Sequence, residues 1–528
     1  MRDFQLPGRS PAHATEGMAA TPNPLATSAA IDVLRRGGNA IDAAVAAAAV
    51  LAVVEPNQTG IGGDCFVLYA PKGQGPLIGL NGSGRAPQAA TVDWYLRHGF
   101  TEIPPYNPHA VTVPGAVDAW ACLLADHGTR GFDELLQPAI RYAEQGFPVH
   151  SRTAWEWAEA AQNLRGDPNA ARIFLPDGRA PRAGELHRNP ALAETLREVA
   201  RKGRDGFYTG RVAEDIVSYL HQLGALHALD DLAQHRSEYV TPISTNYRGV
   251  DICQIPPNNQ GITALIMLNV LAGFPLREFE PLSAERLHLE IEAGRLAFRD
   301  RNALFADMAK ATVPVAEVLS TAYAAKLAAC IDLRRAMADL PPPLMRKSDT
   351  VYFCVVDRDR NAVSFINSVY YSFGTGIVTP NTGIALQNRG TSFRVDPQHP
   401  NCIGPGKRPL HTIMPGMVMQ GGRALMPYGV MGGDYQPFGH THFLTNVLDF
   451  GCDLQEALDM ARVFYSGGVA QLERGIPKAA ADGLVARGHR VAPAPEPFGG
   501  GHAIRIDWQS GVLTAGSDPR MDGCAIGY

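Results

Sequence analysis

The sequence has no concentration of charge of one sign. Its 528 residues include 47 Lys and Arg and 52 Asp and Glu, and the basic residues are scattered along the chain, so the formal net charge is −5. Proteins that bind nucleic acid need a basic face against the phosphate backbone. We therefore expect no nucleic-acid partner.

Long hydrophobic runs are also lacking. The longest, residues 43–54, holds about twelve apolar residues, mostly alanine, whereas a helix needs about 20 to cross a membrane. The first 24 residues contain early prolines and charges but no apolar segment of the kind found in a secretory signal. The pattern favours a buried core helix at 43–54 and no membrane partner.

Cysteine is sparse, and its spacing suggests no pairing. The sequence contains no CxxC pair and no Cys/His cluster with the spacing of zinc ligands. We expect most thiols to be small buried apolar groups, and we expect neither a metal ion nor an organic cofactor. Without a signal segment, the cytoplasm is the expected compartment. The eight cysteines are Cys65, Cys122, Cys253, Cys330, Cys354, Cys402, Cys452 and Cys524.

Apolar periodicity and turn residues predict a mixture of helices and strands. Residues 23–55 predict two helices separated at Gly37 and Gly38, and residues 65–69 predict a strand. Helical patterns recur at 118–126, 134–144 and 284–306.

A proline-rich segment at 340–349 (LPPPLMRKSD) divides the chain. Its three prolines and two cations favour an extended, solvated linker. Strand-forming residues follow at 350–357 and, after a turn, at 361–371. A solvated linker that runs into a buried hairpin indicates a boundary between residues 1–349 and 350–528.

Thr350 is the first residue after this linker and a candidate nucleophile. A threonine hydroxyl is a weak nucleophile unless a base lies beside it. Cleavage after Asp349 would free the α-amine of Thr350, whose ordinary pKa of about 7.7–8.0 suits a base at neutral pH. A threonine that opens a strand is more often structural, so both interpretations stay open on these residues alone.

Eight stretches, in order along the chain, resemble the γ-glutamyltranspeptidase family of N-terminal-nucleophile (Ntn) hydrolases. This resemblance implies a four-layer αββα sandwich of the α/β (α+β) class. It also implies an α chain (1–349) and a β chain (350–528) that arise by autocleavage and stay associated, while a dimer of αβ units is left open. The stretches are MAATPNPLATSAAIDVLRRGGNAIDAAVAAAAVLAVVEPNQTGIGGDCF, HAVTVPGAVDAW, LLQPAIRYAEQGFPV, PPNNQGITALIMLNVL, DTVYFCVVDRDRNAVSF, FGTGIVTPNTGIALQN, GPGKRPLHTIMP and GVMGGDYQP.

The resemblance assigns catalytic roles to particular residues. It implies that Thr350 is the nucleophile, that the bond after Asp349 is cleaved, and that Ser368 supports the nucleophile with its hydroxyl. It places Gly432 and Gly433 where two backbone N–H groups form the oxyanion hole. Glycine suits that position because it has no Cβ to block the tetrahedral intermediate, although a tight turn is the alternative explanation of a Gly-Gly pair.

Several residues depart from the family pattern where the family binds the α-ammonium and α-carboxylate of a γ-glutamyl group. Ser392 stands where the family has an aspartate, and Tyr370 stands where it has an asparagine, which would shorten the pocket. Arg389 adds a positive charge nearby. Without the acidic residue, an α-ammonium would be buried unpaired at a high cost.

Three further positions are candidate substrate contacts. Arg85 lies two residues out of register with the family's arginine, and His411 and Thr412 replace a pair of serines. Arg85 or Arg389 could bind a carboxylate with two hydrogen bonds, or each could form a structural salt bridge. His411 is either a donor to the anion or a structural histidine.

These departures predict a small anionic amide without an amino group as substrate. They resemble the branch of the family that contains oxamate amidohydrolase, which splits oxamate into oxalate and ammonia in urate degradation. A γ-glutamyl hydrolase or transpeptidase acting on glutathione-like substrates remains an alternative, as does an acylase with a longer, more apolar pocket. An unprocessed, non-catalytic protein is a further alternative, because Thr350-Val351-Tyr352 replaces the family's Thr-Thr-His and removes a hydroxyl.

Overall fold

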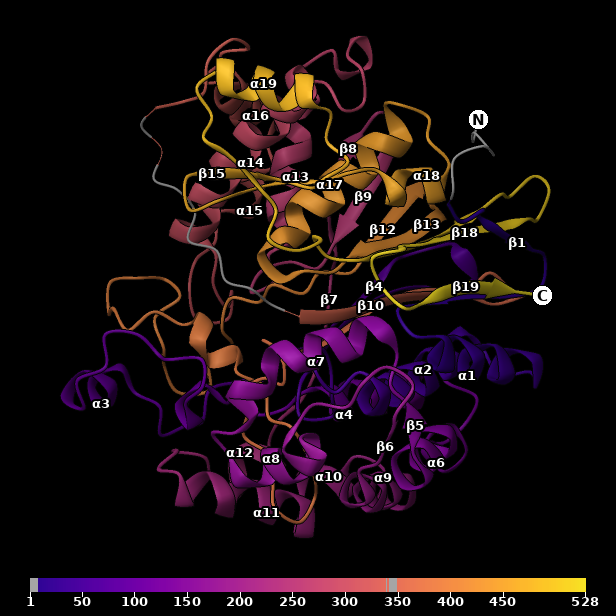
Figure 1. The fold of residues 1–528 in the computed structure, drawn as a ribbon, viewed down its shortest axis with the longest axis vertical. Helices are drawn as coiled ribbons and strands as arrows, with labels where there is room; N and C mark the ends of the chain where they lie inside the picture. Colours follow the sequence, from indigo (N-terminus) through magenta and orange to yellow (C-terminus); the bar gives the residue numbers. More distant parts are fainter. Residues whose placement is uncertain (1–7, 339, 341–348) are drawn as a thin grey trace.

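The computed structural model describes residues 8–338, 340 and 349–528, and for Asp349 it describes the backbone alone. Most of the linker predicted at 340–349 therefore lies outside the described residues. Figure 1 shows two β-sheets stacked at the centre, with helices above and below them.

The described residues form two seven-stranded antiparallel sheets. The first has the order β1 (Ala12–Ala14), β18 (Leu513–Ser517), β17 (Gly501–Ile506), β13 (Arg423–Val430), β12 (Gly416–Gln420), β9 (Val250–Gln254) and β8 (Ile243–Tyr247). The second has the order β19 (Cys524–Gly527), β2 (Met18–Thr21), β10 (Asp349–Val356), β11 (Ala362–Tyr370), β3 (Asp64–Ala70), β4 (Ile78–Gly82) and β7 (Glu238–Val240).

Strand β10 is buried on both faces, as a central strand between two layers must be. Tyr352 and Cys354 point into the apolar core between the two sheets. Val351, Phe353 and Val355 point the other way, into the core between the second sheet and its helices. This alternation follows the two-residue period of a strand, and it explains why the β10 sequence is apolar throughout.

Helices cover the outer face of each sheet, which completes four layers (Figure 1). Against the first sheet lie α13 (Gly261–Leu271) and α17 (Gln436–Leu448), and α14 (Ala284–Leu304) packs against both helices. Against the second lie α1 (Pro24–Arg35), α2 (Ala40–Val54) and α4 (Ala116–His127). Helix α6 (Gln137–Gln145) packs against α2, and α9 (Pro190–Lys202) packs against α6. The predicted αββα sandwich is confirmed.

Shorter elements complete the described chain. The helices are α3 (Val92–Arg97), α5 (Phe132–Leu135), α7 (Ser151–Leu164), α8 (Pro168–Phe174), α10 (Asp205–Tyr208), α11 (Gly210–Gln222), α12 (Leu229–Ala233), α15 (Val315–Val318), α16 (Thr321–Ala328), α18 (Leu454–Asp459) and α19 (Lys478–Ala486). The strands are β5 (Phe147–Pro148), β6 (Leu186–His187), β14 (Val463–Ser466), β15 (Val469–Leu472) and β16 (Val491–Pro493).

The alanine-rich segment forms helix α2, and every residue of this helix is buried. The Asn39 side chain accepts from the first turn, and the Asp42 carboxylate accepts the Asn39 backbone N–H, so a capping box fixes where the helix begins. Small side chains let neighbouring elements pack closely on all sides. The predicted core helix is confirmed, and among the described residues no helix is long and apolar enough to cross a membrane.

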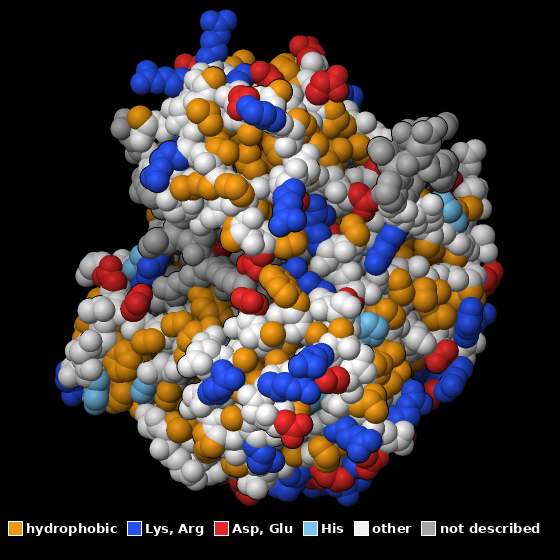
Figure 2. Space-filling view, in the orientation of Figure 1, with side chains coloured by type: hydrophobic (Ala, Val, Ile, Leu, Met, Phe, Trp, Pro, Cys, Tyr) orange, Lys and Arg blue, Asp and Glu red, His pale blue; other side chains and the backbone are white. Residues whose placement is uncertain are grey.

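The described surface carries charges of both signs side by side. On the face drawn in Figure 2, Lys and Arg side chains are interspersed with Asp and Glu, and no broad area has one sign. This pattern agrees with the scattered charge of the sequence.

His187 should make stability depend on pH. Its ring packs among Phe147, Trp157 and Phe174, and burial lowers its pKa to about 4. In the unfolded chain the His187 ring becomes protonated below about pH 6.5, whereas in the folded protein it stays neutral down to about pH 4. The unfolding free energy that depends on the neutral ring is therefore present above pH 6.5 and is lost as the pH falls toward 4. Between pH 7 and pH 5 we expect the wild type to lose roughly 2 kcal/mol more unfolding free energy than His187→Phe. Denaturant titrations at both pH values measure this, and parallel losses in the two proteins would contradict it.

Candidate active site

Thr350 lies at an irregularity in the pairing of β10 with β11. Asp349 pairs with Tyr370 and Val351 pairs with Asn367, so Thr350 alone lies opposite the two residues Ser368 and Val369. A β-bulge of this kind breaks the regular ladder and re-aims side chains, often beside a functional site. It therefore sets the direction of the Thr350 side chain.

The Thr350 hydroxyl donates a hydrogen bond to Ser368. The two Oγ atoms are 3.3 Å apart, and the Ser368 Oγ also accepts the backbone N–H of Tyr370 at 2.8 Å. The structure thus brings together the predicted nucleophile and its predicted supporting hydroxyl. That the two groups act in catalysis stays a prediction.

The glycine-rich turn before β3 supports the end of β11. The Asn367 side chain donates to the Thr59 hydroxyl at 2.8 Å and to the Gly60 carbonyl at 3.2 Å. A Cβ on Gly63 would lie only 2.2 Å from the carbonyl oxygen of Ser368. Glycine at this position therefore allows the close approach that holds the Ser368 segment in place.

Thr350 lines a cavity of about 320 Å³. Gly432 lines the same cavity, so the predicted nucleophile and one predicted oxyanion-hole glycine meet there. Much of the remaining wall is apolar. The apolar lining residues are Met431, Tyr435, Phe464, Pro495, Pro497, Phe498 and Met521.

Charged groups also line this cavity. Glu156, Glu496 and Arg152 all lie in its wall, and Arg152 bonds Glu156 at 2.6 Å. The expected missing acid concerns Ser392, which does not line this cavity, so that expectation stays a prediction; the acidic residues here are Glu156 and Glu496. Sequence reasoning missed these residues because they come from α7 and the 495–499 loop, whereas the family motifs lie elsewhere in the chain.

Gly432 and Gly433 stand at the start of a helical segment. Gly432 has φ +110° and precedes the 3₁₀ turn Gly433–Tyr435, which leads into α17. Among the described residues no acceptor takes the N–H of either glycine. Such amides at a helix N-terminus favour negative charge, which suits the predicted oxyanion hole.

The buried Gln260 side chain forms hydrogen bonds that fix the Gly433 backbone. The Gln260 side chain donates to the carbonyls of Gly433 at 2.9 Å and Thr412 at 2.6 Å. Arg301 donates to the Gln260 Oε1 at 2.7 Å and also bonds Asp434 at 2.5 Å. Gln260 lies in the family stretch PPNNQG, but nothing in the sequence indicated this role.

Arg389 is a buried cation that does not use all of its hydrogen-bond donors. Its guanidinium lies 3.7 Å from the centroid of the Tyr370 ring and donates to the Thr412 hydroxyl at 2.8 Å. Its Nε and Nη2 atoms have no partner among the described residues. Burial lowers its pKa to about 10, so it stays charged at neutral pH.

Tyr370 and Thr412 line a second cavity, of about 70 Å³, together with Ser392. Tyr370 has φ +82°, in the left-handed region that a bulky residue rarely adopts. Tyr370 is not among the residues that line the larger cavity, and its expected effect on the length of the substrate pocket stays a prediction.

Arg85 and His411 have structural partners. Arg85 bonds Glu238 at 2.5 Å and the Gly406 carbonyl at 3.0 Å. The buried His411 lies 3.0 Å from Asp64 through Nε2, and burial lowers its pKa well below the usual value while that of Asp64 rises to about 6. A neutral His411 therefore donates to Asp64, and the structure supports the salt bridge for Arg85 and the structural role for His411.

The arrangement provides a hydroxyl, backbone N–H donors and a cavity that holds an acyl group. Such a set can form and break an ester at Thr350 once a base is present.

Comparison with known proteins gives the family. Residues 26–528 match the gamma-glutamyltranspeptidase family. The glutathione hydrolase-like YwrD proenzyme of Bacillus subtilis is 39% identical over 97% of this chain and 98% of its own. The oxamate amidohydrolase proenzyme of Klebsiella pneumoniae is 37% identical over 97% of this chain and 99% of its own. These two values do not single out the oxamate branch.

Solved structures agree with this comparison. The crystal structure of cephalosporin acylase from Bacillus halodurans superposes with a TM-score of 0.94 at 41% identity, covering 100% of this chain and 99% of that one. Relatives at this identity and coverage share the fold and the proenzyme organisation, in which both chains come from one precursor. The chain therefore belongs to the gamma-glutamyltranspeptidase family and is a self-processing amidohydrolase with the Ntn αββα fold.

Proposed function

We propose that this protein cleaves itself between Asp349 and Thr350 and then hydrolyses a small carboxylate-bearing amide, with oxamate as the first choice of substrate. The observation that carries the proposal is the Thr350 hydroxyl, bonded to Ser368 and lining a cavity whose wall includes Gly432. In this account residues 1–349 and 350–528 are the α and β chains.

Processing begins with attack of the Thr350 Oγ on the Asp349 carbonyl carbon. The peptide C–N bond breaks, the nitrogen takes up the hydroxyl proton, and an ester joins the two residues. Water hydrolyses this ester, which leaves a carboxylate on Asp349 and a free amine and hydroxyl on Thr350. That amine then lies close enough to its own hydroxyl to act as its base.

Turnover repeats this chemistry on the substrate. The Thr350 amine takes the hydroxyl proton while Oγ attacks the amide carbon, and the N–H groups of Gly432 and Gly433 stabilise the oxyanion. The protonated amine gives its proton to the departing nitrogen, so ammonia leaves and an acyl ester remains. Water then releases the acid and restores the Thr350 hydroxyl.

Arg389 supports a substrate that carries a carboxylate. A buried guanidinium with two unsatisfied nitrogens is costly, and an anion in this position would satisfy both of them. Arg389 faces the Tyr370 ring, and the Tyr370 N–H bonds the Ser368 hydroxyl that accepts from Thr350. Oxamate joins a carboxylate directly to its amide, and in this proposal it spans these neighbouring groups. A place in urate degradation would follow if oxamate is the substrate.

A larger substrate is the second candidate. The cavity of about 320 Å³ has much more room than oxamate needs, and its apolar wall suits a longer acyl or leaving group. Glutathione, a γ-glutamyl anilide and a glutaryl amide, assayed beside oxamate, distinguish the γ-glutamyl hydrolase and acylase alternatives from the first choice.

Arg389→Gln should reduce oxamate hydrolysis selectively. Loss of its charged hydrogen bonds to a carboxylate should lower kcat/KM by about 100-fold, while oxamide, which lacks the carboxylate, should change by only a few-fold. Steady-state ammonia release measures both substrates.

Arg85→Gln is the matched control, because Arg85 is already paired with Glu238. It should retain kcat/KM near the wild-type value. Equal losses on oxamate and oxamide in Arg389→Gln would show that Arg389 does not recognise the carboxylate.

A further inference from the structure

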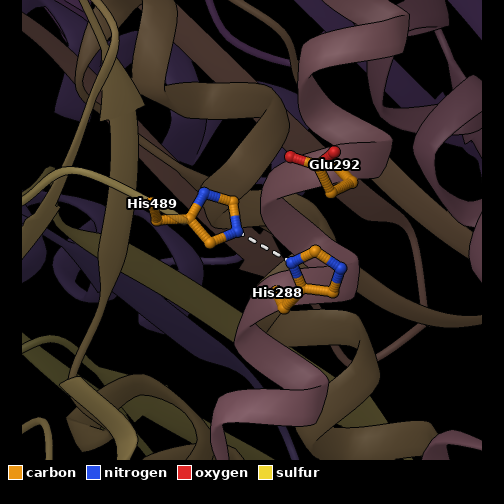
Figure 3. Close-up of side chains that lie close together, drawn as sticks. All are labelled: His288, Glu292 and His489. Carbon is orange, nitrogen blue, oxygen red and sulfur yellow. Dashed lines mark hydrogen bonds between the residues drawn. The ribbon is translucent and has the colours of Figure 1, made fainter. Parts of the chain in front are cut away.

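Three potential metal ligands meet far from Thr350 in the sequence. His288 and Glu292 lie on successive turns of α14, and His489 approaches them from the segment between α19 and β16 (Figure 3). All three are buried, and their ligand atoms lie within 4.8 Å of one another. Histidine nitrogens and a carboxylate are a donor set typical of Zn²⁺ and related ions.

The hydrogen bonds of His288 leave the right nitrogen available as a ligand. Its Nε2 lies 2.8 Å from the carbonyl oxygen of Asp332. A carbonyl can only accept, so Nε2 carries the proton and Nδ1 has a lone pair. An outer bond of this kind, from the second ring nitrogen to a carbonyl, is what orients most metal-binding histidines.

His489 faces that lone pair directly. Its Nε2 lies 2.7 Å from the Nδ1 of His288. Because that Nδ1 can only accept, His489 donates to it through Nε2–H. For its Nε2 to bind a metal ion, the ring must be neutral with its proton on Nδ1. Neutral imidazole is the form that binds a metal ion.

Two hydrogen bonds orient the Glu292 carboxylate and leave some of its oxygen lone pairs unused. One carboxylate oxygen accepts from Arg295 at 2.7 Å, and the other accepts the backbone N–H of Met337 at 2.8 Å. An ionised carboxylate has about four acceptor positions, so these two bonds leave room for a metal bond. Arg487, the other cation beside the rings, is paired with Glu285.

We propose that His288, Glu292 and His489 bind one divalent transition-metal ion of the Zn²⁺ type. Ligand nitrogens on a tetrahedral Zn²⁺ lie about 3.3 Å apart, so the two rings would separate by roughly 0.6 Å from their hydrogen-bonded distance. Water would complete the coordination, as it does in other sites with three protein ligands. Metal binding itself does not depend on the proposed substrate or on cleavage.

The site would join the two chains that the proposed cleavage creates. His288 and Glu292 belong to residues 1–349, and His489 belongs to residues 350–528. The same side chains hold the segment before the linker, because His288 bonds the Asp332 carbonyl and Glu292 bonds the Met337 N–H. A bound ion would thus fix the end of the α chain and a β-chain loop to α14.

Zinc titration of the full, tag-free protein tests the proposal. After treatment with a chelator and dialysis, isothermal titration should show one Zn²⁺ bound per αβ unit. Co²⁺ should give the visible absorption of a tetrahedral site. Absence of Zn²⁺ binding at micromolar concentrations would overturn the proposal.

His489→Gln separates metal binding from folding. Its amide can still donate to the Nδ1 of His288, so the fold should persist, while Zn²⁺ affinity should fall by more than about 100-fold, beyond what loss of an outer-shell partner costs. His98→Gln, at an exposed histidine, should bind like the wild type. Unchanged affinity in His489→Gln would also overturn the proposal, whatever the outcome with oxamate.

Discussion

Thr350→Ala is expected to remain a single chain of 528 residues and to lose amide hydrolysis. The variant lacks the only atom that, in this account, attacks both the Asp349 carbonyl and the substrate. Removing a nucleophile of this kind costs at least about 10⁴-fold in kcat. Denaturing electrophoresis and ammonia release on the same preparation measure the two effects together.

Thr350→Ser is the matched control. It keeps a hydroxyl that can lie near Ser368, so it should still be cleaved and should retain activity. A cleaved Thr350→Ala would contradict the assignment of the scissile bond, and an active one would contradict the assignment of the nucleophile.

Gly499→Ala is expected to lower kcat by about 10²- to 10³-fold, the usual effect of losing one oxyanion-hole donor. A Cβ on Gly499 would lie 2.2 Å from the carbonyl oxygen of Met431. That carbonyl belongs to the same peptide unit as the Gly432 N–H, so displacing the oxygen turns the donor away from the cavity. Steady-state kinetics should show the loss mainly in kcat, since Arg389, the proposed partner of the carboxylate, is unchanged.

Gly421→Ala isolates the effect of backbone strain. Gly421 has φ +56°, close to the +60° of Gly499, but a Cβ there would meet nothing within 4 Å. It should lose about 1 kcal/mol of stability and retain its activity. Equal activity in the two variants would show that the Gly499 contact does not position the oxyanion hole.

Much of the fold could be predicted from local patterns. Helix α2 and strands β10 and β11 were predicted because apolar periodicity and linker composition are local signals. The helix predicted at 134–144 is instead two helices, α5 and α6, which part at Leu136. Pro138 follows at the start of α6, and its missing N–H suits the first turn of a new helix.

The site was predictable only in part. Thr350 stands out through the linker before it, and Gly432 through the family motif, so both were named. Gln260, Arg152 and Glu156 meet the site through contacts between distant segments, which no spacing rule encodes. The pairing of His288 with His489 spans 201 positions, so no short spacing in the sequence indicated a metal site.

Charge arguments from single positions were the least reliable. Arg85 and Arg389 were both candidates in the sequence, yet the structure pairs Arg85 with Glu238 and leaves two nitrogens of Arg389 without a partner among the described residues. Which cation can serve a ligand depends on its neighbours in space. The same holds for Glu156, whose carboxylate is already bonded to Arg152 and Gln58.

Intact mass spectrometry of the purified wild-type protein tests the central claim most directly. The account predicts two chains, of 349 and 179 residues, with the smaller beginning at Thr350. A single uncut chain, or a small chain that begins at any other residue, would contradict the account of Thr350 as the cleavage site and nucleophile.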